Sequence, residues 1–255
     1  MNIVIIGSGN VASVLGRKFK AAGHHILQVV SRNASAASAL AYEWNTKSAN
    51  YMSLVNKHAD VYIVAVTDHS IAQVIAELKL PGKVVAHTAG SVNKDVLKKV
   101  TDHYGVFYPL QSLRKETTTV PAIPIFFEGS DDTTNKVLQS LALSISPEQV
   151  TKASTDDRIK LHVAAVVVNN FTNYLYALAE DYCKKEGIDF QQLIPLIEET
   201  AQRLKTTSPS TTMTGPAARH DQETIQKHLA LLEGYPKLKE IYKMLSESIE
   251  KAISH

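Results

Sequence analysis

Two glycines and an alanine near the start of the chain have the spacing of a dinucleotide-binding loop. Gly7, Gly9 and Ala12 follow the apolar run Ile3–Ile6 in the pattern G-x-G-x-x-A, and a helical pattern begins at Val11. Such a loop permits a tight turn, a close approach of pyrophosphate to the backbone, and phosphate binding at the helix N-terminus. The pattern predicts a cofactor loop made of Gly7, Ser8, Gly9, Asn10, Val11 and Ala12. The alternative is a glycine-rich turn that holds no ligand.

The residues after the second apolar run indicate which dinucleotide is preferred. An NAD site carries Asp or Glu near this point to bind the ribose 2′-hydroxyl. Here the residues are Ser31, Arg32 and Asn33. A guanidinium offers paired donors to a 2′-phosphate, and the two neighbours add neutral donors. NADP is therefore predicted as the cofactor; the alternative is that Arg32 only stacks on the adenine.

Two further loops follow apolar runs and are expected to flank the nicotinamide half of the cofactor. Ligands of doubly wound sheets bind at the carboxyl ends of the strands. The residues concerned are Val66, Thr67 and Asp68 in one loop and Thr88, Ala89 and Gly90 in the other. Asp68 has an equally good alternative as the N-cap of a helix over 70–78.

A polar stripe in an apolar helical stretch is the first candidate for catalysis. His162, Asn169 and Asn173 fall within about 40° of one another at 100° per residue. Because buried polar groups need partners, such a stripe is either hydrogen-bonded or lines a wet cleft. We expect His162 to donate a proton and Asn169 to hold a polar group of the substrate. The alternatives are a solvent-facing stripe and a dimer seam.

A second candidate lies in the run Thr-Gly-Pro-Ala-Ala-Arg-His-Asp. Its predicted site residues are Thr214, Arg219 and Asp221, with Arg219 as an anchor for a substrate carboxylate. The alternative is that Asp221 caps a helix and its neighbours face solvent.

The elements that must position these residues change in kind near residue 151. Before it, strand-length apolar runs alternate with helical patterns, which is typical of a doubly wound parallel sheet. The runs are Ile3–Ile6, Ile26–Val30, Val61–Val66, Val84–His87, Val106–Tyr108 and Ile123–Phe127. The helical patterns are Val11–Ala22, Ala34–Trp44, Ser70–Leu78 and Asp131–Ser144, and Arg114–Pro121 is expected to be an exposed loop.

After residue 151 the pattern is helical throughout. A long helix is predicted from a Thr155 N-cap to a stop at Gly187, followed by helices over about 191–206, 221–233 and 237–253. The fold class is therefore α/β: a doubly wound Rossmann sheet (1–151) followed by an all-α C-terminal domain (152–255).

Composition excludes several classes of protein. Of the 255 residues 44% are hydrophobic and the net charge is +2, which is typical of a globular protein and argues against nucleic acid or an anionic membrane as partner. The single cysteine, Cys183, rules out a disulfide framework and is expected in the core. The sequence shows no pattern of metal ligands. With no signal peptide or membrane-spanning run in the sequence, a cytoplasmic location is expected.

These motifs resemble known families. The Ile-Ile-Gly-Ser-Gly-Asn-Val-Ala loop, the Ser-Arg-Asn triplet and the Val-Ala-Val-Thr-Asp segment resemble pyrroline-5-carboxylate reductases and deazaflavin-dependent NADP reductases. The Tyr108–Gln111 segment, residues 162–170 and the Thr-Gly-Pro run resemble a narrower Rossmann-like family of NADP oxidoreductases with a 6-phosphogluconate-dehydrogenase-like helical C-terminal domain. The resemblance covers nearly the whole chain. It implies NADP binding and a homodimer built through the helical domain, and it names no substrate.

The expected activity is hydride transfer between NADP and a small carbonyl or imine substrate in a cleft between the domains. A protein that binds NADP without catalysis, as a redox sensor or assembly partner, would share every feature of the glycine loop. A deazaflavin-linked hydride carrier is a further alternative.

Overall fold

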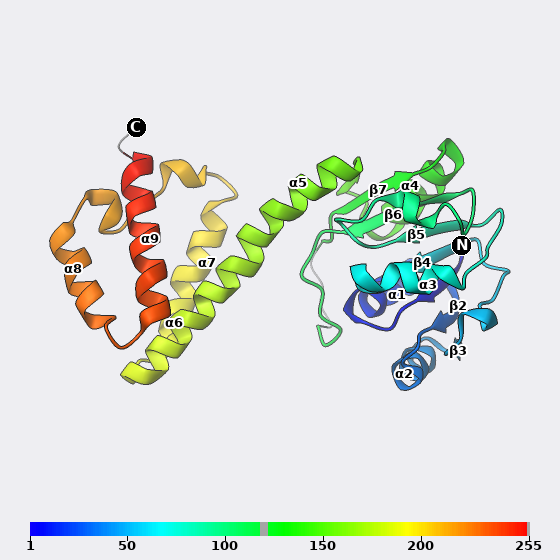
Figure 1. The fold of residues 1–255 in the computed structure, drawn as a ribbon, viewed down its shortest axis with the longest axis horizontal. Coiled ribbons are helices and arrows are strands. Elements are labelled where there is room, and N and C mark those ends of the chain that lie inside the picture. Colours follow the sequence, from blue (N-terminus) through cyan, green and yellow to red (C-terminus); the bar gives the residue numbers. More distant parts are fainter. Residues whose placement is uncertain (118–121, 254–255) are drawn as a thin grey trace. The chain divides into compact units, whose positions relative to one another are not determined.

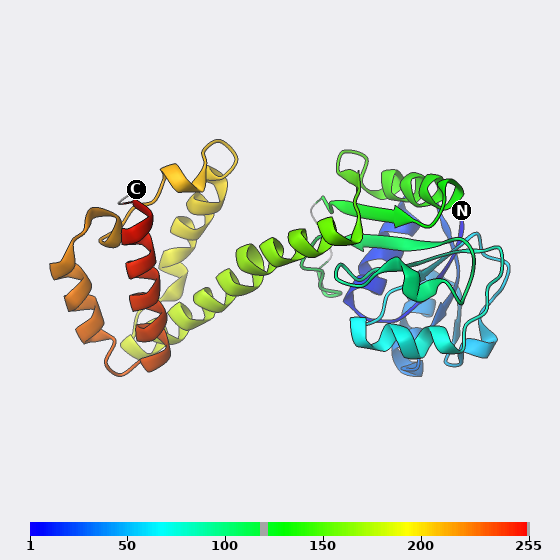
Figure 2. The ribbon, with the colours of Figure 1, turned by 45° about the horizontal axis from the view of Figure 1, so that its top comes forward.

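The computed structural model describes residues 1–117 and 122–253 (Figures 1 and 2). Its contacts divide the chain into two compact units, Met1–Asn169 and Asn170–His255. The last strand ends at Lys152, next to the boundary expected from the sequence, whereas the division by contacts falls within the long helical stretch that follows. Part of the loop expected over Arg114–Pro121, residues 118–121, lies outside the described residues.

The first unit is built on an eight-stranded sheet. Its strand order is β3-β2-β1-β4-β5-β6-β7-β8, so the order reverses direction between β1 and β4. The strands are β1 (Asn2–Ile6), β2 (His25–Val30), β3 (Lys47–Ala49), β4 (Val61–Val64), β5 (Val84–His87), β6 (Tyr104–Pro109), β7 (Ile125–Gly129) and β8 (Val150–Lys152). The pairs are parallel except β6 with β7, which run antiparallel. The doubly wound sheet is confirmed, and the expectation that all its strands are parallel is wrong at that one pair.

Because side chains alternate between the two faces along β1, the core lies in two layers, one on each face of the sheet. Ile3 and Ile5 pack with the helices on one face, and Val4 and Ile6 pack on the other. The helices of the first layer are α1 (Asn10–Ala21), α2 (Ala34–Trp44) and α4 (Asp132–Ile145), and α3 (Ile71–Ala76) packs in the second. The sheet is therefore covered on both faces, as the near-continuous apolar strands require (Figure 2).

The long helical stretch begins within the first unit and is not uniform. Its N-cap is Ser154 rather than Thr155, in a capping box with Asp157. α5 (Thr155–Ala165) leads into a π-helix (Val166–Phe171) and then into α6 (Thr172–Glu186). Gly187 follows at φ 72° as the predicted C-terminal stop.

The second unit contains the remaining helices. After α6 come α7 (Ile194–Arg203), α8 (Gln222–Leu231) and α9 (Pro236–Ile253). Cys183 is buried, as expected, and the hydroxyl of Tyr242 on α9 lies 2.8 Å from Nδ1 of His228 on α8. Within the described part of the chain, no helix is long and apolar enough to cross a membrane.

Candidate functional site

The glycine loop occupies the point where the strand order reverses, between β1 and α1. Gly7 has a φ of +125°, and a Cβ there would lie 2.0 Å from the carbonyl oxygen of Ala65 on the neighbouring chain segment. Both the backbone conformation and the space therefore require glycine. A Cβ on Gly9 would meet nothing within 4 Å, so the space beside that residue is open. Ala12 is fully buried where α1 packs on the sheet.

The start of α1 has the features of an anion-binding helix N-terminus. Its N-cap is Gly9, which offers no side-chain oxygen to the first N–H groups, and the first turn contains no acidic residue. The free N–H groups and the positive end of the helix dipole therefore face the open space at the loop.

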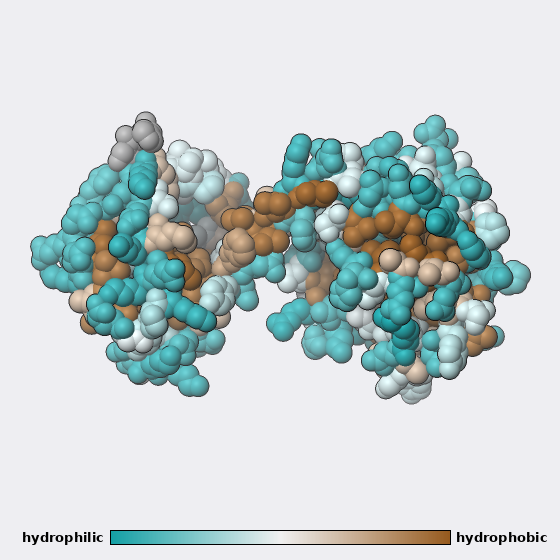
Figure 3. Space-filling model, in the orientation of Figure 1, coloured by the Kyte–Doolittle hydropathy of each residue, from teal (hydrophilic) through white to brown (hydrophobic). Residues whose placement is uncertain are grey.

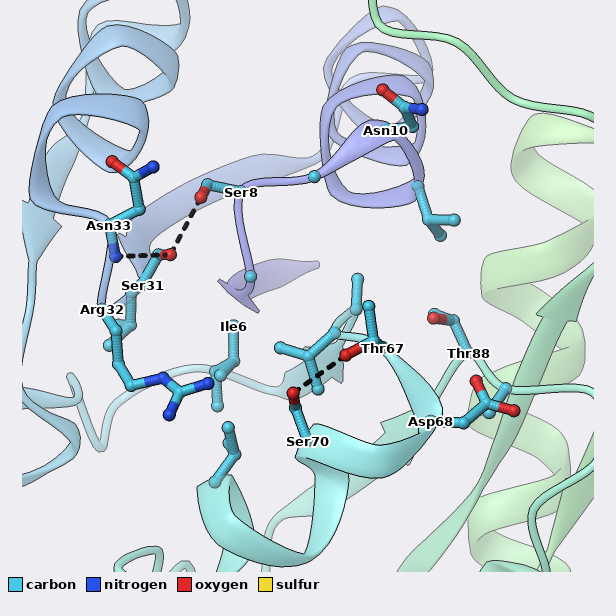
Figure 4. A pocket seen from close by; sticks show the side chains of 18 of the residues that line it. Ile6, Ser8, Asn10, Ser31, Arg32, Asn33, Thr67, Asp68, Ser70 and Thr88 are labelled. Atoms are coloured by element: carbon cyan, nitrogen blue, oxygen red, sulfur yellow. Dashed lines mark hydrogen bonds between the residues drawn. The ribbon is translucent and has the colours of Figure 1, made fainter.

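A cavity of about 610 Å³ opens at this loop, within the range of cofactor and ligand pockets (Figure 4). Of the predicted cofactor residues, thirteen line it: Gly7, Ser8, Gly9, Asn10, Val11, Ser31, Arg32, Asn33, Val66, Thr67, Asp68, Thr88 and Ala89. Ala12 and Gly90, also predicted, are not among the lining residues. The lining residues that were not predicted as cofactor residues are Ile6, Val30, Met52, Ala65, Ser70 and Val74.

One end of the cavity carries the residues predicted to select NADP (Figure 4). The Ser31 hydroxyl lies 2.8 Å from that of Ser8, which ties the second strand to the glycine loop. Arg32 is exposed and donates from Nη1 to Oε1 of Gln73. The side chain of Asn33 accepts from the N–H of Ala36 and so caps α2, a structural role in addition to the predicted one.

Asp68 and Thr88 lie away from Arg32 in the cavity (Figure 4). The alternative role of Asp68 as a helix N-cap is wrong, because the N-caps here are Thr67 and Ser70. That carboxylate instead accepts from the hydroxyl of Ser91 at 2.7 Å, and the short helical turn over Asp68–Ser70 begins at Thr67. The neighbouring Thr88–Gly90 loop is held from behind by His87, whose Nδ1 accepts from the N–H of Ala89 at 3.2 Å. Burial lowers the pKa of His87 to about 4, so the ring is neutral at neutral pH and remains an acceptor.

The side chain of His162 lies against Tyr108, near the carboxyl end of strand β6. Its Nδ1 lies 3.1 Å from the hydroxyl of Tyr108, and the two rings meet edge to face at a centroid distance of 6.3 Å. Tyr108 is not among the site residues predicted from the sequence, where it belongs only to a segment that resembles the family. Its place at the carboxyl end of β6, where ligands of such sheets bind, is the signal that could have found it.

A buried ion pair fixes α5 on the sheet one turn before His162. The guanidinium of Arg158 is fully buried and donates to Glu128 on β7 and to the carbonyl of Ala153. Lys94 also contacts Glu128, at 2.6 Å. Burial alone would raise the pKa of Glu128, but the hydrogen bonds and charges of its two cationic partners outweigh burial and lower it.

The predicted stripe along the long helix does not keep its regular spacing. Asn169 lies in the π-helix, where hydrogen bonds run from i to i+5, so 100° per residue does not apply between His162 and Asn173. All three side chains are exposed. The role of Asn169 stays a prediction.

The three candidate site residues in the second unit are Thr214, Arg219 and Asp221. Thr214 and Arg219 are exposed. Asp221 caps α8, accepting from the N–H of Thr224 at 3.0 Å and from its hydroxyl at 2.7 Å, as the structural alternative proposed. A catalytic role for these residues also stays a prediction. In residues 1–117 and 122–253 no three His, Cys, Asp or Glu side chains gather to hold a metal ion.

Comparison with known proteins agrees with this geometry. Residues 2–90 match a family model described as NADP oxidoreductase, coenzyme F420-dependent, and residues 123–249 match a domain of unknown function, DUF2520. A Bacteroides fragilis protein provisionally named an NADP oxidoreductase (BF3122) is 36% identical over 98% of both chains, with a TM-score of 0.91. The chain belongs to the family of that protein. No curated protein matches the sequence.

More distant members of the same fold include two reductases. A 1-pyrroline-5-carboxylate reductase from Streptococcus pyogenes is 17% identical over 100% of this chain and 99% of its own, with a TM-score of 0.63. An imine reductase from Myxococcus stipitatus, solved with NADP+, is 16% identical over 100% and 94%, with a TM-score of 0.70. At these identities the likeness shows the fold alone. The family is thus an NADP-binding Rossmann domain joined to a helical region.

Proposed function

We propose that this family member transfers a hydride between NADP and a small carbonyl or imine substrate. The observation that carries the proposal is the cavity at the reversal of strand order, which has an uncapped helix N-terminus at the loop, Arg32 at one end, and Asp68 and Thr88 away from it. The fit to a dinucleotide is supported by Gly7, which has no room for a Cβ, and by the open space at Gly9.

Each group in the cavity has a definite task in this proposal. The N–H groups at the start of α1 bind the pyrophosphate, and Arg32 with Ser31 binds the 2′-phosphate of NADP. When bound, NADPH supplies the hydride. The Thr88–Gly90 loop and Asp68 lie beside the nicotinamide half.

His162 is the proposed origin of the proton that reduction requires, because an imidazole exchanges protons readily near neutral pH. Asn169 is proposed to hold the polar group of the substrate. Thr214, Arg219 and Asp221 are proposed to contact the substrate as well, with Arg219 as the partner of a carboxylate.

The experiment is an assay of NADPH oxidation with a panel of 2-oxo acids, cyclic imines and a deazaflavin. We expect turnover with at least one oxo acid or imine, and we expect His162→Ala and Asn169→Ala to reduce it. If NADPH binds but no panel member is reduced, a non-catalytic NADP sensor accounts for the protein better. Oxidation by the deazaflavin alone would make it a deazaflavin-linked hydride carrier.

We further propose that the protein is a homodimer built through its helical unit. Large apolar side chains there are exposed although the unit buries few of its own, and a second copy of the same surface would cover them. The most exposed are Phe171, Leu196, Leu204, Leu231 and Met244. Apolar side chains also gather along α5 (Figure 3).

Sedimentation velocity tests this second proposal. The double variant Leu196→Asp and Leu231→Asp is expected to be monomeric, because both side chains are over 60% exposed and the new charges would be buried only in a dimer. Tyr42→Asp, at a 92% exposed side chain of the first unit, is the matched control and is expected to remain dimeric. A wild type that sediments as a monomer at every concentration would refute the dimer.

A further inference from the structure

We propose that the Tyr108 hydroxyl hands the proton to the substrate, and that His162 acts behind it by returning a proton from solvent. This inference rests on the proposed reduction and assigns its last proton transfer to a residue outside the predicted site.

The first support is the contact between the two side chains. Tyr108 stands near the carboxyl end of β6, and its hydroxyl is 3.1 Å from Nδ1 of His162 on α5. The tyrosine is buried except for a small part of its surface, whereas His162 is exposed. A proton can therefore enter at the imidazole and leave at the phenol.

The second support is the closeness of Tyr108 to the cofactor cavity. A Cβ on Gly90 would lie 2.7 Å from Cζ of Tyr108, the ring atom that bears the hydroxyl. Gly90 directly follows Thr88 and Ala89, which line the cavity beside Asp68 (Figure 4). The close approach of the ring explains why this loop ends in glycine. The charge of Asp68, which lines the cavity, also acts on the phenol, so the hydroxyl lies near the end of the cavity where the nicotinamide is proposed to lie.

The third support is the charge around the phenol. Burial raises the pKa of Tyr108, and the nearby carboxylate of Asp68 raises it further. The hydroxyl therefore keeps its proton at neutral pH, and the raised pKa makes the phenol a weaker acid than free tyrosine. Its proton leaves only as the substrate oxygen or nitrogen becomes strongly basic on hydride addition, with His162 in contact to replace it. Asp68 itself accepts from the hydroxyl of Ser91, and the phenol hydroxyl contacts His162.

The fourth support is the anchoring of α5. Arg158 lies one turn before His162, and its guanidinium also contacts the carbonyl of Val92 at 3.3 Å and the hydroxyl of Thr155 at 3.2 Å. Because these bonds join the helix to the loop after β5, the imidazole is held at a fixed place opposite Tyr108. Arg158 is thus a positioning residue.

The proposed proton transfer returns both side chains to their starting state. The substrate carbon accepts the hydride, the O–H bond of Tyr108 breaks, and its proton bonds to the carbonyl oxygen or imine nitrogen. The phenolate oxygen takes the Nδ1 proton of protonated His162, and the neutral imidazole then takes a proton from water. The net change is one hydride and one proton added to the double bond, with Tyr108 and His162 restored.

A titration by NMR tests the pair without any substrate. In protein labelled with ¹³C at tyrosine Cζ and ¹⁵N in histidine, we expect Tyr108 to titrate above free tyrosine. Tyr108→Phe removes the hydroxyl that lies 3.1 Å from Nδ1 and should change the ¹⁵N chemical shift of His162 at neutral pH, whereas Tyr42→Phe, at an exposed tyrosine, should not. An unchanged ¹⁵N chemical shift of His162 Nδ1 in Tyr108→Phe would overturn the proposal.

Kinetics with whichever panel substrate is reduced tests the role. A lost general acid costs about 10²- to 10⁴-fold in rate, so Tyr108→Phe should lower kcat by that factor while the Kd of NADPH stays unchanged. His162→Gln should lower kcat less than Tyr108→Phe does and should also leave the Kd of NADPH unchanged. Gly90→Ala, which displaces the ring, should act in the same direction as Tyr108→Phe.

Full kcat in Tyr108→Phe would overturn the assignment. If no panel member is reduced by the wild type, the proposed function fails and the NMR titration alone decides whether the pair exists.

Discussion

The two units of this chain differ in how completely they bury their own apolar surface. In the first unit the strands are covered on both faces, and Ile3, Val4, Ile5 and Ile6 are fully inaccessible. In the second unit buried apolar side chains are few, and leucines on α7 and α8 remain more than 60% exposed. The first unit therefore buries its own core on both faces of the sheet, whereas the exposed apolar side chains of the second unit are those that the proposed dimer would cover.

The same contrast holds for charges. The first unit buries an ion pair between Arg158 and Glu128, while the pairs of the second unit are surface contacts such as Arg203 with Glu199 on α7. Charge should thus matter for the stability of one unit and very little for that of the other.

The largest expected effect comes from breaking the buried pair. Arg158→Met keeps the apolar volume but leaves Glu128 and the carbonyl of Ala153 short of a donor, which should lower the free energy of unfolding by about 3 kcal/mol. Urea denaturation measures this change. Arg203→Met, the matched control on α7, is expected to leave the midpoint unchanged. Equal effects of the two variants would show that the buried pair contributes no more to stability than the surface pair.

The next effect is a dependence of stability on pH that resides in the first unit. His87 has a native pKa of about 4, against about 6.5 when unfolded. As pH falls below 6.5 the unfolded state takes up a proton that the native state does not, so stability is complete above pH 6.5 and declines towards pH 4. The decline is about 3 kcal/mol.

Thermal unfolding between pH 4 and 7.5 measures this dependence. His87→Gln should flatten the profile over the acidic range, whereas His220→Asn, at an exposed histidine of the second unit, should leave it as in the wild type. A wild-type profile that is flat over this range would show that the burial of His87 does not govern it.

A smaller effect distinguishes the helix-capping role of Asn33 from its proposed role beside the 2′-phosphate. Aspartate caps a helix as well as asparagine, so Asn33→Asp should leave stability unchanged. The new carboxylate would lie beside the proposed 2′-phosphate and should weaken NADPH binding about fivefold, from a repulsion of about 1 kcal/mol. NADH affinity serves as the control. An equal loss for both nucleotides would mean that the position does not face the 2′-phosphate.

Helices and strands are predicted correctly from the sequence where apolar periodicity decides the structure. Ala34–Trp44 and Val84–His87 were predicted with their observed bounds. The edge strands β3 and β8 were missed because each has three residues and a largely exposed, polar surface. The antiparallel pairing of β7 was also missed, since a buried apolar run looks the same in either direction.

The candidate site was likewise predictable only where a local sequence pattern determines the geometry. The residues of the glycine loop were found because their spacing reports a backbone geometry, and all but Ala12 line the cavity. Tyr108 and Arg158 were missed because their partners, His162 and Glu128, are respectively 54 and 30 residues distant in sequence. The π-helix at Asn169 was missed because the 100° per residue used to place His162, Asn169 and Asn173 on one face holds only for a regular α-helix.

The most direct test of the central claim is a calorimetric titration of wild type and Arg32→Ala with NADPH and with NADH. Loss of charge-assisted hydrogen bonds of about 1.5–3 kcal/mol corresponds to roughly 10- to 100-fold in Kd. We predict that wild type binds NADPH more tightly than NADH by that factor and that Arg32→Ala binds both alike. Equal affinity of the wild type for the two nucleotides, or binding of neither, would contradict the assignment of this cavity to NADP.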